Sequence, residues 1–158
     1  MESTQRIMKD SRIGSYGALG LVLAVGLRAA LLIALPQDFV IVALGASAGF
    51  GRLMAVAVMA LVAPVAAKGQ GLAKDVGGRT GWRDLLWAGL IATPILGPFA
   101  YVQPEAVLGT FGAAAVFLWW FRGLLLRRLD GSSGDCLGFA VYAGQLFLLL
   151  AVLAVSGS

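Results

Sequence analysis

Five long apolar runs constrain this chain more than any other feature. They cover residues 15–35, 39–67, 85–102, 106–121 and 136–155. A helix needs roughly 20 apolar residues to cross the hydrocarbon core of a bilayer. Hydrophobic residues make up 59% of the sequence and charged residues 13%, whereas about 25% of a soluble domain is charged. The sequence therefore predicts an all-α, polytopic membrane protein with about five transmembrane helices, in one integral membrane domain over residues 1–158.

The basic residues between these runs predict an orientation. Ten of the twelve Lys and Arg residues precede the first run, separate the second from the third, or separate the fourth from the fifth. The connections at 36–38 and 103–105 carry none. Because cytoplasmic loops are enriched in Lys and Arg, we expect the N-terminus in the cytoplasm and the C-terminus outside. A sixth crossing, made by splitting the second run, would break this alternation, so we expect one long or re-entrant element there.

Small residues and prolines suggest local features of the helices. The glycines at 45–51 could break the second helix or let it tilt, and Pro94 and Pro98 predict kinks in the third. The pair Trp119-Trp120 predicts an interfacial end of the fourth helix. Glycine-rich stretches at 45–49 and 109–112 would permit close helix packing.

The first polar cluster lies just before the first apolar run. Asp10 could hold Mg²⁺, Lys9 and Arg12 could neutralise phosphate oxygens, and Ser11 could donate a hydrogen bond. The alternative is an ordinary basic flank of a transmembrane helix, with an N-cap.

A second polar cluster, Asp130-Gly131-Ser132-Ser133-Gly134-Asp135, precedes the last run. Its glycines would let a ligand approach the backbone, and N–H groups at a helix start favour anions. The cluster could therefore bind an anionic ligand. Alternatively, Asp135 caps the helix.

Two arginines lie inside apolar runs, where a charge at the bilayer centre costs about 2.5–3.5 kcal/mol on insertion scales. Arg52, near the middle of the second run, could reach a phosphate in a cavity, whereas Arg28 could extend to the nearer membrane surface. Lys68 could contact phosphate or likewise extend to the interface. Gln145 suits an interhelical hydrogen bond.

Composition also excludes some functions. The chain has no histidine and one cysteine, Cys136, so it cannot build an internal disulfide or a Cys/His zinc site. No nucleic-acid partner is expected. The predicted orientation places Asp10, Arg12, Lys68 and Asp135 on one membrane face, where two carboxylates and several cations could form a metal-bridged diphosphate site.

Two segments also resemble a known family. Ile7-Met8-Lys9-Asp10-Ser11-Arg12-Ile13-Gly14-Ser15-Tyr16-Gly17 resembles the IMKDSRIGxYG motif of cobalamin synthase, or adenosylcobinamide-GDP ribazoletransferase. Residues 131–138 resemble its GGxTGDxLGA motif, with Ser133 in the place of Thr. Gly51-Arg52 and residues 67–72 resemble two further elements of that family in the same order.

The resemblance implies a membrane-bound, substituted-phosphate transferase of vitamin B12 assembly in the bacterial inner (plasma) membrane. Such an enzyme joins adenosylcobinamide-GDP to α-ribazole, or its 5′-phosphate, and releases GMP with Mg²⁺. It implies Asp10, Ser11, Arg12 and Asp135 as catalytic residues, Asp10 and Asp135 also as metal ligands, on the cytoplasmic face. It further implies substrate contacts by the following residues: Lys9, Arg52, Lys68, Ser133 and Gly134.

The chain also departs from that family. The family's acidic motif beginning His-x-Asp-Gly, which precedes the first shared motif, is not present, and Gln145 stands where the family has Glu. Val141 and Tyr142 replace its Gln residues and Asp130 replaces a glycine. We expect a fragment, a split-gene product or a misplaced start, with an upstream polypeptide as a partner. The alternatives are a small transporter of an anionic or vitamin-like solute, or a non-catalytic scaffold subunit.

Overall fold

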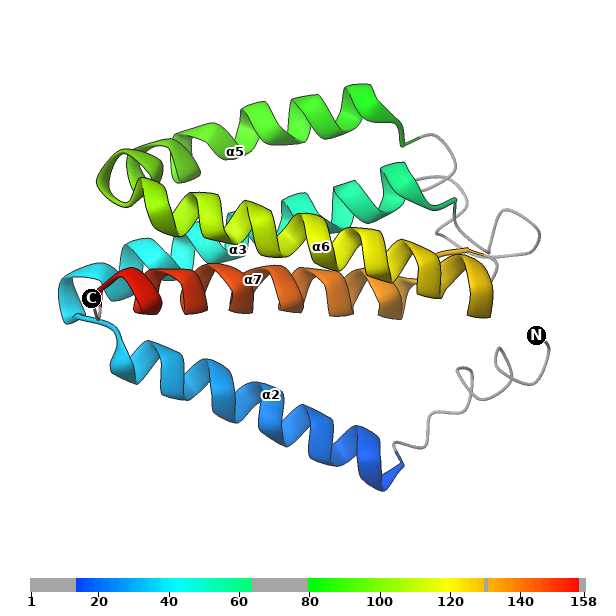
Figure 1. Ribbon diagram of the computed structural model, residues 1–158, viewed down its shortest axis with the longest axis horizontal. Coiled ribbons are helices and arrows are strands. Elements are labelled where there is room, and N and C mark those ends of the chain that lie inside the picture. The colour runs from blue at the N-terminus through cyan, green and yellow to red at the C-terminus, as the bar shows by residue number, and fades with distance from the viewer. Residues whose placement is uncertain (1–13, 64–79, 130, 157–158) are drawn as a thin grey trace.

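The computed structural model describes residues 14–63, 80–129 and 131–156, which form five helices (Figure 1). The helices are α2 (Ser15–Ala34), α3 (Gln37–Leu61), α5 (Trp82–Val102), α6 (Pro104–Arg128) and α7 (Gly134–Ser156). At 1.5 Å per residue each is roughly 30–38 Å long. All five are also apolar enough to cross a membrane. The predicted all-α fold with five spans is confirmed for the described residues.

Successive helices run in opposite directions along the molecule. The N-terminal ends of α2, α5 and α7 and the C-terminal ends of α3 and α6 therefore lie at the same end (Figure 1). This end carries Arg83, Arg127 and Arg128, and is called the basic end below. The alternation agrees with the charge pattern, while the side of the membrane that the basic end faces stays a prediction.

Two expected helix bounds were wrong. The second helix ends at Leu61 rather than at residue 67, and it is continuous across 45–51. Of the two forms expected for this segment, one long element or a re-entrant one, the structure shows the long element. The fourth helix continues past Phe121 to Arg128, because basic residues in a last turn interact favourably with the helix dipole and do not end a helix. Residues 64–67 lie outside the described part of the chain.

The helix ends follow from local chemistry. Pro36 follows the last turn of α2, and Pro104 occupies the first turn of α6, where its missing N–H costs no hydrogen bond. At the start of α5, the backbone N–H of Gly81 donates to Asp84 Oδ2 at 2.8 Å. The helix then continues through both Pro94 and Pro98.

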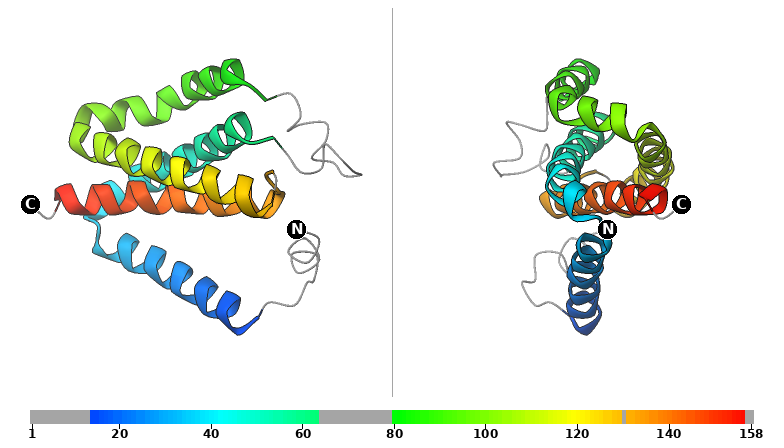
Figure 2. Two further views of the ribbon diagram at one scale, coloured as in Figure 1. Left: turned by 45° about the vertical axis from the view of Figure 1, so that its right-hand side comes forward. Right: turned by 90° about the vertical axis from the view of Figure 1, so that its left-hand side faces the viewer.

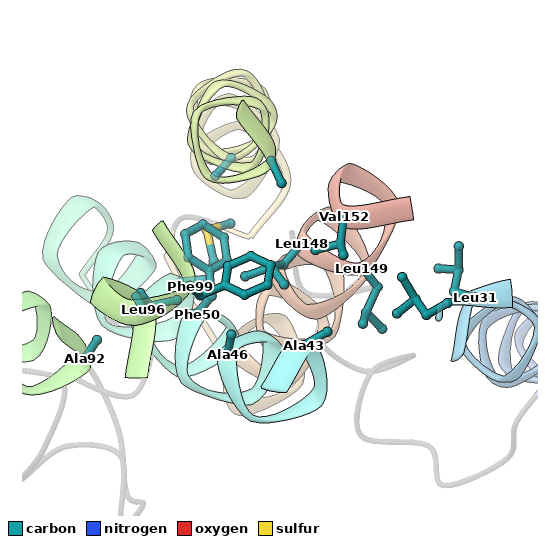
Figure 3. Close-up of a cluster of buried hydrophobic side chains, with 14 residues drawn as sticks. Leu31, Ala43, Ala46, Phe50, Ala92, Leu96, Phe99, Leu148, Leu149 and Val152 are labelled. Atoms are coloured by element: carbon teal, nitrogen blue, oxygen red, sulfur yellow. The ribbon is translucent and has the colours of Figure 1, made fainter. Parts of the chain in front are cut away.

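The main core lies between α3 and α7, the most extensive helix pair, and extends to α5 (Figure 3). Two glycines allow the close approach of this pair. A Cβ atom at Gly51 would lie 2.6 Å from the backbone oxygen of Val141, and one at Gly144 would lie 2.6 Å from Met54 Cγ. The predicted glycine stretches contribute less, since a Cβ at Gly45 would meet nothing within 4 Å.

A smaller core cluster lies toward the basic end. It joins the C-terminal parts of α3 and α6 to the first turns of α7 through six buried side chains: Val58, Val62, Phe121, Leu125, Cys136 and Ala140. Cys136 is a buried packing residue, as its apolar neighbours suggest. This cluster supports the segment that begins α7.

Helix α2 packs on the other helices over only part of its length. Its contacting residues form one stripe, in which Leu31 and Leu35 are buried and Ala24, Arg28 and Leu32 are partly buried. All of residues 14–23 are exposed. Accordingly, α2 diverges from α7 toward the basic end and lies to one side of the other four helices (Figures 1 and 2).

Candidate functional site

The segment before α7 is tied to the end of α3. The backbone N–H of Ser132 donates to the oxygen of Ala63 at 2.9 Å, and its hydroxyl donates to the oxygen of Val62 at 3.2 Å. Ser132 is 3% exposed, so both bonds are shielded from solvent. Gly131 has φ of 157°, a conformation that glycine adopts most easily. The described part of the second polar cluster, residues 131–135, is therefore held beside the C-terminal end of α3, and Asp130 lies outside the described residues.

Ser133, rather than Asp135, caps α7. Its Oγ accepts a hydrogen bond from the backbone N–H of Cys136 at 3.5 Å and donates to Cys136 Sγ at 3.2 Å. The N–H groups of the first turn of a helix lack intrahelical acceptors. Gly134 and Asp135 begin the helix at the basic end, and both are exposed.

The carboxylate of Asp135 is available for a ligand. No hydrogen bond or ion pair reaches it from the described residues, and its place in the first turn suits a negative charge. Within these residues, no three His, Cys, Asp or Glu side chains lie close enough to hold a metal ion. A single carboxylate such as that of Asp135 can hold Mg²⁺ only together with further oxygen ligands. In many protein sites, one or two carboxylates and the phosphates of the substrate bind the ion together.

Arg52 lies nearer the middle of the bundle than Asp135. Its neighbour Gly51 packs against Val141 and Gln145, about one and a half to three turns beyond Asp135 along α7. The side chain of Arg52 is exposed, and no described residue pairs with it. The structure therefore does not bring Arg52 into contact with Asp135, Ser133 or Gly134.

The remaining predicted site residues lie outside the described part of the chain. These are Lys9, Asp10, Ser11, Arg12 and Lys68. Their roles stay predictions. The described helix ends nearest to them in sequence, the start of α2 and the end of α3, both lie at the basic end (Figure 1).

A polar contact between α2 and α7 was only partly anticipated. Arg28 Nη1 donates a short hydrogen bond to Gln145 Oε1, and its guanidinium carbon lies 5.9 Å from the ring centroid of Tyr142. Tyr142 Oη donates to the backbone oxygen of Ala24 at 2.8 Å. The interhelical role of Gln145 is confirmed, whereas Arg28 contacts α7 instead of extending to the nearer surface. Arg28 lies on the stripe of α2 that begins at Ala24 and contacts the other helices. This helical spacing is the signal in the sequence that could have indicated the contact of Arg28 with α7.

Comparisons with known proteins agree with the resemblance of the two motifs. A family model described as cobalamin-5-phosphate synthase matches residues 1–153. The chain is 31% identical over 153 residues to the adenosylcobinamide-GDP ribazoletransferase of Ralstonia pickettii (strain 12J), covering 97% of this chain and 59% of that protein. It is 37% identical over 164 residues to the protein of the same name from Leptothrix cholodnii, covering 97% and 60%.

The chain thus spans about three fifths of the length of these curated relatives. No solved structure matches the described fold.

Proposed function

The chain belongs to the cobalamin-5-phosphate synthase family, and from this we propose that it serves as an adenosylcobinamide-GDP ribazoletransferase. In this proposal it acts alone or with a polypeptide that supplies the rest of its relatives' length. Its five apolar helices make it an integral membrane protein. We place it in the bacterial inner membrane, with the basic end in the cytoplasm, as the positive-inside rule favours.

One observation carries the proposal: Ser132 anchors the start of α7 to the end of α3 at the basic end. This anchor supports an exposed carboxylate at Asp135 and the backbone N–H groups of Gly134 and Asp135, which no described residue accepts. Both features suit a diphosphate and its counter-ion. Lys68, which follows the end of α3 by a few residues, would add a cation on the same face.

The reaction joins adenosylcobinamide-GDP to α-ribazole or its 5′-phosphate. The oxygen of a ribosyl hydroxyl forms a bond to the phosphorus attached to the cobinamide. The bond from that phosphorus to the oxygen that bridges the two phosphates breaks, GMP leaves with the bridging oxygen, and the proton of the hydroxyl passes to solvent. Bound Mg²⁺ supplies charge neutralisation on the diphosphate oxygens.

The residues of the chain divide the remaining tasks. Asp135 and Asp10 would hold the ion, while Arg12, Lys9, Lys68 and Arg52 would neutralise and orient the phosphate oxygens. Ser11 would donate a hydrogen bond, and Ser133 would do so by turning its hydroxyl proton from Cys136 Sγ to the substrate.

The test uses membranes that contain the full chain, with and without a polypeptide carrying the acidic motif. GMP release from adenosylcobinamide-GDP and α-ribazole 5′-phosphate is measured in each. We expect Asp135→Asn to lower the rate at least about 100-fold, the order of loss seen when one preorganised charge-stabilising group is removed. The matched control is Asp84→Asn, an amide replacement at the same end of the molecule.

Two results would count against the proposal. Absence of GMP release in both arrangements would overturn the transferase function. Full activity of Asp135→Asn, in membranes where the wild type is active, would remove Asp135 from the site.

A further inference from the structure

The contact between α2 and α7 places a cation near the centre of the bundle. Gln145, which accepts the hydrogen bond from Arg28, lies eleven residues from either end of α7. At 1.5 Å per residue, this is about 16 Å from each end of that helix. Arg28 therefore meets α7 at its midpoint.

The direction of Arg28 excludes a simple extension to the nearer surface. Arg28 is six residues from Ala34, so the closer end of α2 is the one away from the basic end. Helical side chains point toward the N-terminus of their helix, which here is the direction of the bundle centre. The contacts with Gln145 and Tyr142 hold the guanidinium in that direction.

The contacts of Arg28 do not balance its charge. Gln145 offers a neutral amide oxygen and Tyr142 a ring face, and no carboxylate of the described residues pairs with Arg28. A guanidinium has five N–H donors, and only one hydrogen bond to the described residues is present. A charge in the interior of a membrane protein needs a partner or water, and it commonly marks a binding position.

Toward the basic end, most of the part of α2 that precedes Arg28 is exposed. Arg28 is partly exposed, and every residue from 14 to 23 is exposed because α2 leaves α7 beyond Ala24 (Figures 1 and 2). The two helices diverge toward the basic end, where Asp135 lies. Along α7, Gln145 is about 15 Å from Asp135.

We propose that Arg28 is the cation of a phosphate-binding subsite between α2 and α7, with Gln145 and Tyr142 holding the guanidinium in place. The ligand is a phosphate monoester, and the choice of the 5′-phosphate of α-ribazole rests on the proposed function. Arg28 then determines whether the protein prefers α-ribazole 5′-phosphate to α-ribazole.

The test measures binding, so it does not depend on turnover. Purified full chain in maltoside micelles, which carry no phosphate, is titrated with α-ribazole 5′-phosphate and with α-ribazole. We expect the phosphorylated ligand to bind roughly 10–100-fold more tightly, as hydrogen bonds to a charged group imply. Arg28→Gln should remove this preference, whereas Arg122→Gln, on the exposed face of α6, should keep it.

Gln145→Glu separates a binding role from a structural one. The new carboxylate would pair with Arg28, so the α2–α7 contact is kept while the positive charge is neutralised. We expect this variant to have an undiminished unfolding temperature and no preference for the phosphorylated ligand. If Arg28→Gln fails to fold, Gln145→Glu still tests whether the positive charge of Arg28 is needed for the preference.

Three outcomes are informative beyond these. Equal affinity of the wild type for both ligands, or a preference that persists in Arg28→Gln or in Gln145→Glu, would overturn the subsite. Added phosphatidic acid, a lipid phosphate monoester, that competes with α-ribazole 5′-phosphate would support a subsite that also accepts a lipid phosphate, and absence of competition would support a soluble ligand alone. A preference that depends on Arg28, without GMP release, would uphold the subsite while the transferase function fails.

Discussion

Replacing Gly51 by alanine tests the closest approach of α3 and α7. A Cβ atom at this position would lie 2.6 Å from the backbone oxygen of Val141 and 2.9 Å from Gln145 Cγ. Because Cβ atoms essentially never approach other atoms closer than 3.0 Å, at least 0.4 Å of separation is needed at the first contact. The backbone of α7 cannot rotate away as a side chain would, so the whole helix must shift.

The expected loss of stability follows from two opposing terms. Overpacking of this kind costs about 1–3 kcal/mol. Part of this cost arises because a shift of α7 opens gaps elsewhere in its interface with α3, and a gap of about 0.5–1 Å forfeits a quarter to a half of the dispersion energy of the atoms involved. Replacing glycine by alanine within a helix returns roughly 0.5–1 kcal/mol. We therefore expect Gly51→Ala to lower the free energy of unfolding by about 1–2 kcal/mol.

Gly45→Ala is the matched control. It makes the same substitution in the same helix, at a position where a Cβ would meet nothing within 4 Å. It should stabilise the protein by up to about 1 kcal/mol. Reversible unfolding in mixed micelles, followed by tryptophan fluorescence, measures both variants. Equal effects of the two substitutions would refute the close approach of α3 and α7 at Gly51.

Three further substitutions test local hydrogen bonds by the same unfolding assay. Ser133→Ala removes the cap of α7 and should cost about 1 kcal/mol, whereas Ser133→Asn should retain most of the stability; equal losses would contradict the cap. Asp84→Ala removes the acceptor for the N–H of Gly81 and should cost about 0.5–1.5 kcal/mol, and an unchanged midpoint would argue against this bond. Thr110→Val removes a buried hydroxyl that bonds only within its own helix, so its effect should stay below about 1 kcal/mol; a larger loss would indicate a partner that the helix does not supply.

Much of the fold could be predicted from the sequence, because a membrane span has a strong apolar signal and prolines at 36 and 104 mark the connections. The bounds were harder to predict where a charge follows an apolar run. The pair Trp119-Trp120 suggested an end of the fourth helix, yet the helix continues to Arg128 because exposed arginines such as Arg122 are compatible with a helix. The close packing at Gly51 depends on how α3 aligns with Val141 of α7, and the sequence of one helix alone does not determine that alignment.

The candidate site was harder to predict because its contacts also join helices that are far apart in the sequence. Sequence order placed Asp135 before the last span, but its support by Ser132 depends on Val62 and Ala63, about 70 residues earlier. The sequence distinguished Arg52 from Arg28 by position along an apolar run, which favoured Arg52 as a phosphate contact, but it did not show which of the two contacts another helix. Arg28 lies in the contacting stripe of its helix, whereas Arg52 lies on an exposed face.

The contact between Arg28 and Gln145 also bears on how the chain is made. The two residues are separated by 117 positions. At a synthesis rate of 5–20 residues per second, roughly 6–23 s pass between their appearance. During that interval α2 must reside in the membrane without the side chain that holds its arginine. The last described helix, α7, therefore completes the environment of the first described one, α2, so a chain that ends before α7 would leave α2 weakly retained and open to quality-control proteolysis.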